Sequence, residues 1–223
     1  MSFSNDKIDR PPFSDQGVLK YERRRYRGID QRIVQAREVR LIDKFFKIVR
    51  RAEGREGGDP ILDLPCGYGR FTALLQESGR AILNSDLSLE MVRRAGQKSG
   101  KPGIVANATQ GLPFKTNVFG LVFSIRLFHH VYDPSDREAI LREFFRVTSG
   151  WAIVSFYRLN GLHLFQRRVR KLFHKSRTKI KMIEPGQFEK EAEAAGFVPV
   201  RVLPLLGGLH AYHLALLKKS SLP

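Results

Sequence analysis

Residues 59–75 read DPILDLPCGYGRFTALL, a run that predicts a strand, a tight loop and the start of a helix. The predicted strand, Ile61 to Leu64, is apolar except for one acid, Asp63. Gly67 and Gly69 shape the loop, because glycine lets the backbone turn sharply and approach a ligand closely. The acid would repel a pyrophosphate, so the run indicates a ligand with hydroxyl or ammonium donors.

The same run resembles the first motif of the class I S-adenosylmethionine (SAM) methyltransferases, which reads acid-x-Gly-x-Gly-x-Gly after the first strand. The match is DLPCGYG, in which Pro65 replaces the first glycine and removes one N–H. The resemblance implies that SAM is the cofactor and S-adenosylhomocysteine (SAH) its product. It also implies that the motif's cofactor-binding residues are Asp63, Pro65, Cys66, Gly67 and Gly69.

A second element of the resemblance is NSDLSLEM, residues 84–91, at the end of the next predicted strand. In a sheet of this kind that end lies beside the glycine loop, so Asp86 can accept bonds from both ribose hydroxyls of the cofactor. The family's D-x-S-x-x-M pattern implies that Leu87 and Met91 lie against the adenine. The residues alone also allow Asp86 to be a helix N-cap, a role that Ser88 could fill as well.

A third element, IVANATQGLPF at residues 104–114, resembles the family segment g-D-a-x-x-L-P-F, whose acid contacts the adenine amino group. Here Asn107 replaces the acid, and its side-chain carbonyl can accept the same bond. The resemblance implies that Asn107 and its neighbour Ala108 bind the cofactor. The aspartate that the family has just before strand four is replaced by Gly120.

The fourth predicted strand, Leu121 to Ile125, leads into RLFHHV at residues 126–131. The family often has a histidine here, close to the transferring methyl group. A hydroxyl acceptor needs a base that titrates near neutral pH, so His130, and with it His129, are the candidate catalytic residues. Arg126 is a candidate ligand for the methionine carboxylate of SAM or for an acidic substrate. The alternative is that one histidine packs and the other caps a loop.

The formal net charge is +17, and the excess lies in two segments outside these motifs. Residues 20–51 hold 12 Lys/Arg against 4 Asp/Glu, and residues 158–181 hold 9 Lys/Arg and no acid. If both segments cover one cleft, they would attract an anionic partner. The second segment also has apolar residues at helical spacing, which is typical of a membrane-surface helix, of a helix packed on the core or of one that contacts RNA. For both segments the plain alternative is a solvated charged face.

Length and composition agree with one soluble domain that has a large core. The chain has 223 residues, 42% of them hydrophobic, and its apolar runs are far shorter than the ~18 residues of a membrane span. The N-terminus has no signal-peptide pattern. The single cysteine, Cys66, excludes an intrachain disulfide and fits a reducing compartment. We therefore expect a cytoplasmic protein, with peripheral contact to an anionic membrane through residues 158–181.

The order of these elements predicts an α/β fold with two regions. The resemblance implies a Rossmann-like, seven-stranded, mostly parallel sheet with an antiparallel last strand and helices on both faces. Residues 1–52 are expected to form an N-terminal arm and basic cap helices. Residues 53–223 are expected to form the SAM-binding core, with a basic lid inserted at about 158–184. Ser135 is the predicted cap of the helix that follows strand four.

The sequence lacks the residues that several other nucleotide-modifying, dinucleotide-binding and metal-dependent activities require. Pro65-Cys66 is similar to the Pro-Cys pair of cytosine-C5 methyltransferases, but that nucleophile follows strand four and this one follows strand one. The signature of base N-methyltransferases is also absent after strand four. Thr72 stands where the dinucleotide fingerprint requires its third glycine. No set of acids near the cleft suggests a metal site, and we expect no metal.

The sequence therefore predicts a SAM-dependent methyltransferase (EC 2.1.1.-). The expected reaction is O-methylation of a small or lipid-linked anionic acceptor, such as a saccharide, a lipopolysaccharide-type molecule or a quinone-type molecule. One alternative is an RNA methyltransferase, which is disfavoured because the chain has no recognised RNA-binding motif. Another is a non-catalytic module with the SAM fold, which the departures at Pro65 and Gly120 would suit. A nicotinamide oxidoreductase is a more distant alternative.

Overall fold

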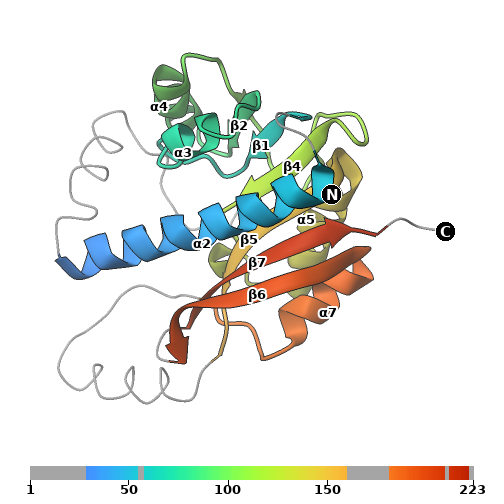
Figure 1. Ribbon diagram of the computed structural model, residues 1–223. Coiled ribbons are helices and arrows are strands. Elements are labelled where there is room, and N and C mark those ends of the chain that lie inside the picture. Colours follow the sequence, from blue (N-terminus) through green and yellow to red (C-terminus); the bar gives the residue numbers. More distant parts are fainter. Residues whose placement is uncertain (1–28, 55–57, 160–180, 209–210, 221–223) are drawn as a thin grey trace.

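The computed structural model describes residues 29–54, 58–159, 181–208 and 211–220 (Figure 1). The predicted N-terminal arm, the first part of the basic cap helix and most of the basic lid lie outside the described residues. The described elements form one continuous sheet with helices around it.

Seven strands form the sheet, in the order β3-β2-β1-β4-β5-β7-β6. The first five strands run parallel, and β7 lies antiparallel between β5 and β6. This arrangement confirms the predicted Rossmann-like sheet with an antiparallel last strand. The strands are β1 (Ile61–Asp63), β2 (Ile82–Asp86), β3 (Ile104–Val105), β4 (Phe119–Ser124), β5 (Thr148–Tyr157), β6 (Phe197–Gly208) and β7 (Tyr212–Lys219).

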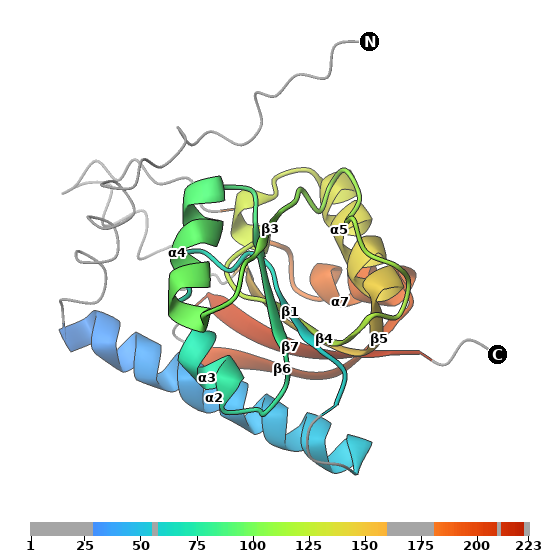
Figure 2. The ribbon, with the colours of Figure 1, turned by 90° about the horizontal axis from the view of Figure 1, so that it is seen from above.

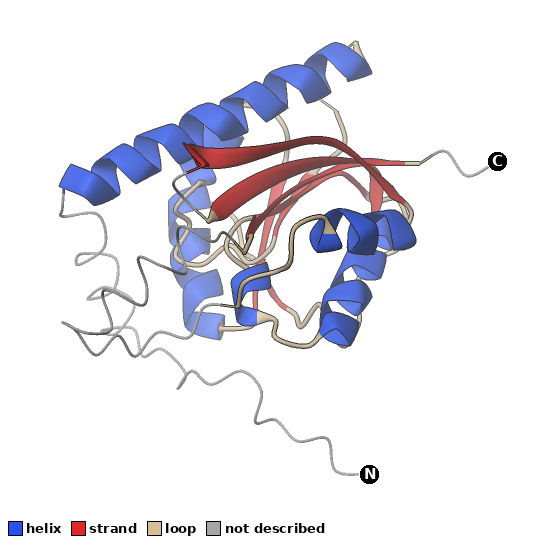
Figure 3. Cartoon of the chain, turned by 90° about the horizontal axis from the view of Figure 1, so that it is seen from below, coloured by secondary structure: helices blue, strands red, loops and turns tan. Residues whose placement is uncertain are grey.

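Helices cover both faces of the sheet, so that the molecule has three layers (Figures 2 and 3). Helices α2, α3 and α4 lie on one face, and α5 and α7 lie on the other. A short 3-10 turn, η2, follows β4. The helical elements are α2 (Ile29–Glu53), α3 (Thr72–Gln76), α4 (Leu89–Ser99), η2 (Phe128–His130), α5 (Pro134–Val147) and α7 (Gln187–Ala194).

An apolar layer on each side of the sheet holds these helices in place. On one face α2 buries Ile42, Phe45 and Val49, whose spacing puts them on one side of the helix. On the other face Phe144 of α5 and Phe188 of α7 are fully buried. Each such side chain stabilises the fold by about 1.5–3 kcal/mol. The two apolar layers therefore hold the strands in place, including the strand ends at which the predicted site residues lie.

The start of α5 differs from the prediction. Its N-cap is Asp133, not Ser135, and Asp133 Oδ1 accepts hydrogen bonds from the Ser135 N–H (3.0 Å) and hydroxyl (2.8 Å). Pro134 occupies the first helical position, where a backbone N–H would have no partner within the helix, so proline costs no hydrogen bond there. The proline marks the helix start, and the capping acid comes directly before it.

Gly120, where the family has an aspartate, lies near the amino end of β4. A Cβ at this position would lie 3.1 Å from the Asp59 Cβ and 3.4 Å from the Arg80 Nη2. Arg80 forms an ion pair with Glu53, the last residue of α2. Asp59 and Arg80 therefore fill the space that an aspartate would need, at the edge of the sheet opposite to the cofactor motifs.

Candidate active site

The carboxyl ends of β1, β2 and β4 meet at one edge of the sheet. The chain passes from β1 to β2 on one side and later adds β4 on the other, so β1 and β4 flank the topological switch point of a doubly wound sheet. In such sheets the ligand crevice lies outside the carboxyl ends at this point. Here Asp63 ends β1, Asp86 ends β2 and Ser124 ends β4. The fold thus brings the predicted cofactor residues together where it usually binds ligands.

The glycine loop after β1 is tied to β2 by hydrogen bonds. The Cys66 N–H donates to the Ser85 carbonyl (2.8 Å), and the Gly67 N–H donates to Asp86 Oδ2 (3.0 Å). Pro65 enters the loop through a cis peptide bond. Gly67 has a φ of +52°, and a Cβ there would meet no atom within 4 Å. The backbone of the loop therefore faces open space beside Asp86, which a ligand can approach closely.

Gly69 packs the second half of the loop against α4. Its φ is +74°, a conformation that residues other than glycine rarely adopt. A Cβ there would lie 2.9 Å from Thr72 Oγ1 and 3.0 Å from the Ala95 Cα, which is too close for a carbon atom. The two glycines of the motif thus have different roles, because Gly67 borders open space and Gly69 allows close packing.

Cys66 supports the loop from inside. Its side chain is buried and clusters with Val92 and Ala95 of α4. Burial, reinforced by the charges of Asp63 and Asp86, raises the pKa of its thiol well above the ordinary range. The thiol therefore stays protonated, whereas a nucleophilic cysteine needs a thiolate. This agrees with the expectation that the Pro-Cys pair does not perform cytosine-C5 chemistry.

Asp63 is a buried carboxylate, only 2% exposed, at the end of β1. Within the described residues, no group donates a hydrogen bond to its Oδ2. Burial, and next the charge of Asp86, raise the pKa of Asp63 well above its ordinary value. A buried polar atom without a partner destabilises a folded protein, so native structures rarely retain one. An ammonium group or another donor from a ligand would satisfy this carboxylate.

Asp86 faces the glycine loop and does not cap α4. Its Oδ1 accepts from the Ser88 N–H (3.0 Å), while the N-cap is Ser88, whose hydroxyl accepts from the Met91 N–H (3.4 Å). A carboxylate has about four acceptor positions, so the bonds from Gly67 and Ser88 still allow Asp86 to accept from ligand hydroxyls. Leu87 is 47% exposed beside it, whereas Met91 is buried in α4. Leu87 therefore faces solvent, whereas Met91 packs inside the protein.

Asn107 and Ala108 follow β3 and lie beside the end of β2, because the Ala106 N–H donates to the Asp86 carbonyl (3.1 Å). Asn107 Oδ1 accepts from both the N–H (3.1 Å) and the hydroxyl (2.9 Å) of Thr109. Both lone pairs of this carbonyl are therefore used, and the side-chain NH₂ is the group left for a ligand. The Asn107 carbonyl is thus bonded within the chain, and the predicted contact of this residue with the cofactor stays a prediction.

The two histidines lie side by side on η2, at the carboxyl end of β4. Their ring centroids are 3.8 Å apart, and the His129 ring also contacts the Tyr157 ring at 5.4 Å. His129 is buried and His130 is half-buried. The Lys181 N–H donates to the His129 carbonyl (3.2 Å). The pair is thus held by packing at the carboxyl end of β4, with His130 the more accessible ring.

Arg126 lies just after β4, and its side chain reaches helix α2 on the face of the sheet. It has a φ of +69°, and its N–H donates to Ser155 Oγ (2.7 Å). Its guanidinium lies 3.5 Å from Glu38 Oε2 of α2 and 5.3 Å from the Tyr212 ring centroid. The side chain is 21% exposed. Arg126, the predicted ligand for a carboxylate, is therefore paired with an acid of the protein itself.

Residues 62–154 match the family model for the methyltransferase domain. The chain contains a methyltransferase domain. The match runs from β1 to β5 and includes the glycine loop, the acid that ends β2 and the histidine pair. The motifs that suggested the family therefore lie inside the matched region.

Relatives of this methyltransferase domain include enzymes with different acceptors. The chain is 30% identical over 96 residues to malonyl-[acyl-carrier protein] O-methyltransferase of Hamiltonella defensa, covering 43% of this chain and 36% of that protein. It is 37% identical over 102 residues to demethylmenaquinone methyltransferase of Corynebacterium urealyticum, covering 46% and 42%. The chain spans less than half the length of these relatives.

Solved structures show that the methyltransferase domain has the class I fold. Magnesium protoporphyrin IX methyltransferase of Synechocystis, solved with bound SAH, superposes with a TM-score of 0.74 at 19% identity, covering 93% of this chain and 96% of that one. A TehB-like SAM-dependent methyltransferase of Corynebacterium glutamicum superposes with a TM-score of 0.61 at 20% identity, covering 93% and 100%. Both likenesses extend beyond the matched domain to almost the whole chain.

A cluster around Glu38 adds residues to the site that the sequence motifs did not include. Glu38 of α2 is fully buried and forms ion pairs with Arg70, just after the glycine loop, and with Arg126. The Tyr212 hydroxyl donates to Glu38 Oε1. Burial raises the pKa of Glu38, but Arg126 and Arg70 outweigh it and hold this pKa below its ordinary value. Glu38 therefore stays charged and fastens α2 to the loop.

The sequence did contain one signal for this cluster. Glu38 lies four residues before Ile42 and seven before Phe45, which puts it on the buried side of α2. A single acid on the apolar side of a helix needs a partner, because an unpaired buried charge is strongly unfavourable. The sequence could not say that the partners are Arg70 and Arg126, which are distant in the chain.

The described residues contain no cluster of three or more His, Cys, Asp or Glu side chains that could hold a metal ion. None of the described helices is long and apolar enough to cross a membrane. His213 packs in the core, where its ring stacks on Phe156 and its Nδ1 lies 2.9 Å from the Ala211 carbonyl. Of the described histidines, the His129–His130 pair is therefore the one that directly follows β4.

Proposed function

We propose that this chain is a SAM-dependent methyltransferase that methylates an oxygen of a small or lipid-linked anionic acceptor. The observation that carries this proposal is the buried Asp63 carboxylate, whose Oδ2 has no donor among the described residues. It lies at the carboxyl end of β1, beside a glycine loop and one strand from Asp86. This pair of acids fits SAM, which offers an ammonium group and two ribose hydroxyls.

The residues fit SAM from one end to the other. Asp63 would accept from the ammonium group, and Asp86 would accept from the ribose hydroxyls. The exposed Leu87 would lie against one face of the adenine. Asn107 would donate from its side-chain NH₂ to a ring nitrogen of the adenine. Asp63 and Asp86 would thus accept hydrogen bonds from SAM, and the Asn107 amide would donate one to it.

When bound, SAM supplies an electrophilic methyl group on a sulfonium. The role of this chain is to place the acceptor oxygen in line with that group and to take up the proton that the oxygen loses. His130 is the candidate base, because it is the more accessible ring of the pair at the carboxyl end of β4. His129 would position it, since its own ring is buried against Tyr157.

The net charge supports an anionic acceptor, and two relatives indicate the chemical classes of acceptor to consider. The net charge of +17 favours encounter with anions, because a field of one sign steers ligands of the opposite sign. Two relatives are methyltransferases whose names give the acceptors as malonyl-[acyl-carrier protein] and demethylmenaquinone, the first at oxygen. An acid and a quinone-type molecule both lie within the class of acceptors proposed for this chain.

Isothermal titration of the purified protein with SAM, SAH and NAD tests the cofactor. We expect binding of SAM and SAH and none of NAD. Asp86→Ala should weaken SAM binding about 10- to 100-fold, since hydrogen bonds to a charged group contribute about 1.5–3 kcal/mol. Glu193→Ala, at an exposed acid of α7, is the matched control and should bind SAM like the wild type. Unchanged affinity in Asp86→Ala would refute the assignment.

SAH release in the presence of candidate acceptors tests the reaction. The panel should contain anionic saccharides, an acyl-carrier-protein thioester with a free carboxylate, and a demethylated quinone. Production of SAH only with one of these acceptors is the expected result. If the protein binds SAM but forms SAH only when RNA is added, and with none of these acceptors, the RNA alternative is supported.

A further inference from the structure

The outer side of α2 carries a continuous line of cations, which we call the α2 basic line: Arg37, Arg40, Lys44, Lys47 and Arg51. Successive members are three or four residues apart, the spacing that aligns side chains along one side of a helix. All five are exposed. At 1.5 Å per residue the line is about 21 Å long. Helix α2 is the outermost element on its face of the sheet (Figures 1 and 2).

Of the acids of α2 whose side chains the structure describes, only Asp43 pairs with a member of this line. Glu38 is buried under the helix, and Glu53 pairs with Arg80 at the other end of the sheet. Asp43 is paired with Lys47 of the line (2.7 Å). Within the described residues, no ion pair involves Lys44 or Arg51. The side of α2 that faces solvent is therefore strongly cationic.

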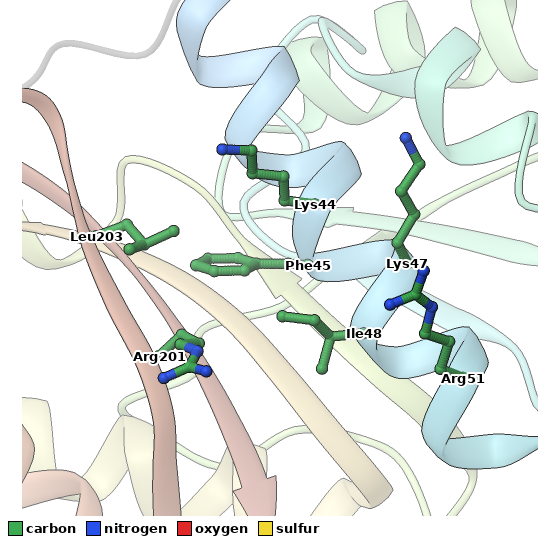
Figure 4. A pocket seen from close by; sticks show the side chains of 7 residues that line it. All are labelled: Lys44, Phe45, Lys47, Ile48, Arg51, Arg201 and Leu203. Carbon is green, nitrogen blue, oxygen red and sulfur yellow. The ribbon is translucent and has the colours of Figure 1, made fainter.

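An apolar groove runs beside the line, between α2 and the edge strand β6 (Figure 4). Its volume is about 320 Å³, and beneath it the ring of Phe45, itself fully buried, points toward β6. Half-buried Ile48 and Leu203 complete the apolar part. No acid is among the described residues that line it. The cations of its rim are Lys44, Lys47, Arg51 and Arg201.

A further apolar side chain lies on the same side of the helix. Ile33 is 56% exposed and precedes Arg37 by four residues, so it extends the line with an apolar end. Cations that flank apolar surface are typical of elements that lie in a membrane interface, where long basic side chains reach the headgroups and apolar ones enter the acyl boundary. A surface that binds nucleic acid through phosphates alone needs no such apolar floor.

We propose that the α2 basic line and its groove, together with Arg201, dock this protein on the headgroups of an anionic lipid membrane. The cations contact lipid phosphates, and the groove takes the apolar part of a lipid that lies beside them. This surface is distinct from the crevice that we assign to SAM, and the proposal does not rest on methyl transfer. Glu38, next to Arg37 in α2, forms an ion pair with Arg70, which follows the glycine loop.

Co-sedimentation with vesicles tests the proposal. The probes are phosphatidylcholine vesicles and vesicles with about 30% phosphatidylglycerol. The wild type should bind only the anionic vesicles, and binding should weaken as salt increases. Lys44→Glu/Arg51→Glu/Arg201→Glu should lose about 100-fold or more in affinity, since each cation near an anionic surface contributes about fivefold. The milder Lys44→Gln/Arg51→Gln/Arg201→Gln removes the three cations without adding acids and should itself lose about 100-fold, less than the reversal variant, which it replaces if that variant misfolds.

A control variant separates this surface from net charge. Lys101→Glu/Lys115→Glu/Lys190→Glu removes the same charge from exposed lysines away from α2 and should keep most of the vesicle binding. Equal losses in the two reversal variants would overturn the proposal, because binding would then follow total charge alone. Absence of vesicle binding by the wild type would also overturn it, as would binding to a single-stranded RNA oligonucleotide in place of vesicles.

Discussion

Substitution of each glycine in the loop by alanine should separate stability from cofactor binding. At Gly69 the new Cβ would lie 2.9 Å from Thr72 Oγ1 and 3.0 Å from the Ala95 Cα, and φ is +74°. The left-handed conformation costs about 1–2 kcal/mol for a residue with a Cβ. Overpacking against the α4 backbone adds about 1–3 kcal/mol. Gly69→Ala should therefore lower the free energy of unfolding by about 2–5 kcal/mol.

Gly67 is the matched comparison. Its φ of +52° carries the same conformational cost, but a Cβ there meets no atom within 4 Å. Gly67→Ala should therefore lose only about 1–2 kcal/mol of stability. That open space lies beside Asp86, where we place the ribose. The methyl group of Gly67→Ala would occupy part of this space, so the variant should bind SAM more weakly although it loses little stability.

Urea denaturation and SAM titration measure the two effects. The midpoints should fall further for Gly69→Ala than for Gly67→Ala, with unchanged m-values. In the fraction that remains folded, Gly67→Ala should show the larger loss of SAM affinity. Equal stability losses in the two variants, or normal SAM binding by Gly67→Ala, would refute this account of the loop.

Three further substitutions have defined outcomes. Because the pKa of Asp63 is raised in the folded protein, its contribution to stability is present at low pH and is lost as pH rises through that pKa. Asp63→Asn should therefore raise the melting temperature at neutral pH, by about 2–4 °C for each kcal/mol of desolvation cost that it removes. The same variant should bind SAM more weakly. A lower melting temperature would contradict this reasoning. His130→Ala should lower turnover about 10²- to 10⁴-fold with nearly unchanged SAM affinity, and full activity would remove it as the base. Arg137 forms a buried two-bond ion pair with Glu191 that joins α5 to α7. Arg137→Ala should therefore cost about 3–5 kcal/mol in urea denaturation, and Arg137→Met/Glu191→Leu should recover most of it; equal losses would contradict this.

The fold could be predicted from local patterns because each has a short-range cause. The run from Ile61 to Gly69 combines an apolar strand with two glycines, and both glycines adopt positive φ in the structure. The acids that end β1 and β2 lie at the same edge because parallel strands share their carboxyl ends. The histidine pair was found in the same way, since it closely follows β4.

The remaining features depend on contacts that no local pattern encodes. Glu38 reaches Arg70 and Arg126 only because α2 crosses the face of the sheet beside the glycine loop. The Asn107 carbonyl is used by Thr109, two residues later, a contact that follows from a rotamer and not from its position in the motif. Burial likewise decides that Met91 supports α4, while Leu87 faces outward.

The most direct test of the central claim is whether SAH binding removes a proton from Asp63. Burial and the charge of Asp86 raise the pKa of Asp63, and an ammonium group of a ligand beside the carboxyl would lower this pKa and so favour release of a proton. Calorimetric titrations in buffers with different ionisation enthalpies measure the release. We predict proton release with SAH in the wild type, none in Asp63→Asn, and none with 5′-methylthioadenosine, which lacks the ammonium group. Equal release with both ligands, or the same release in Asp63→Asn, would contradict the assignment of Asp63 to the cofactor.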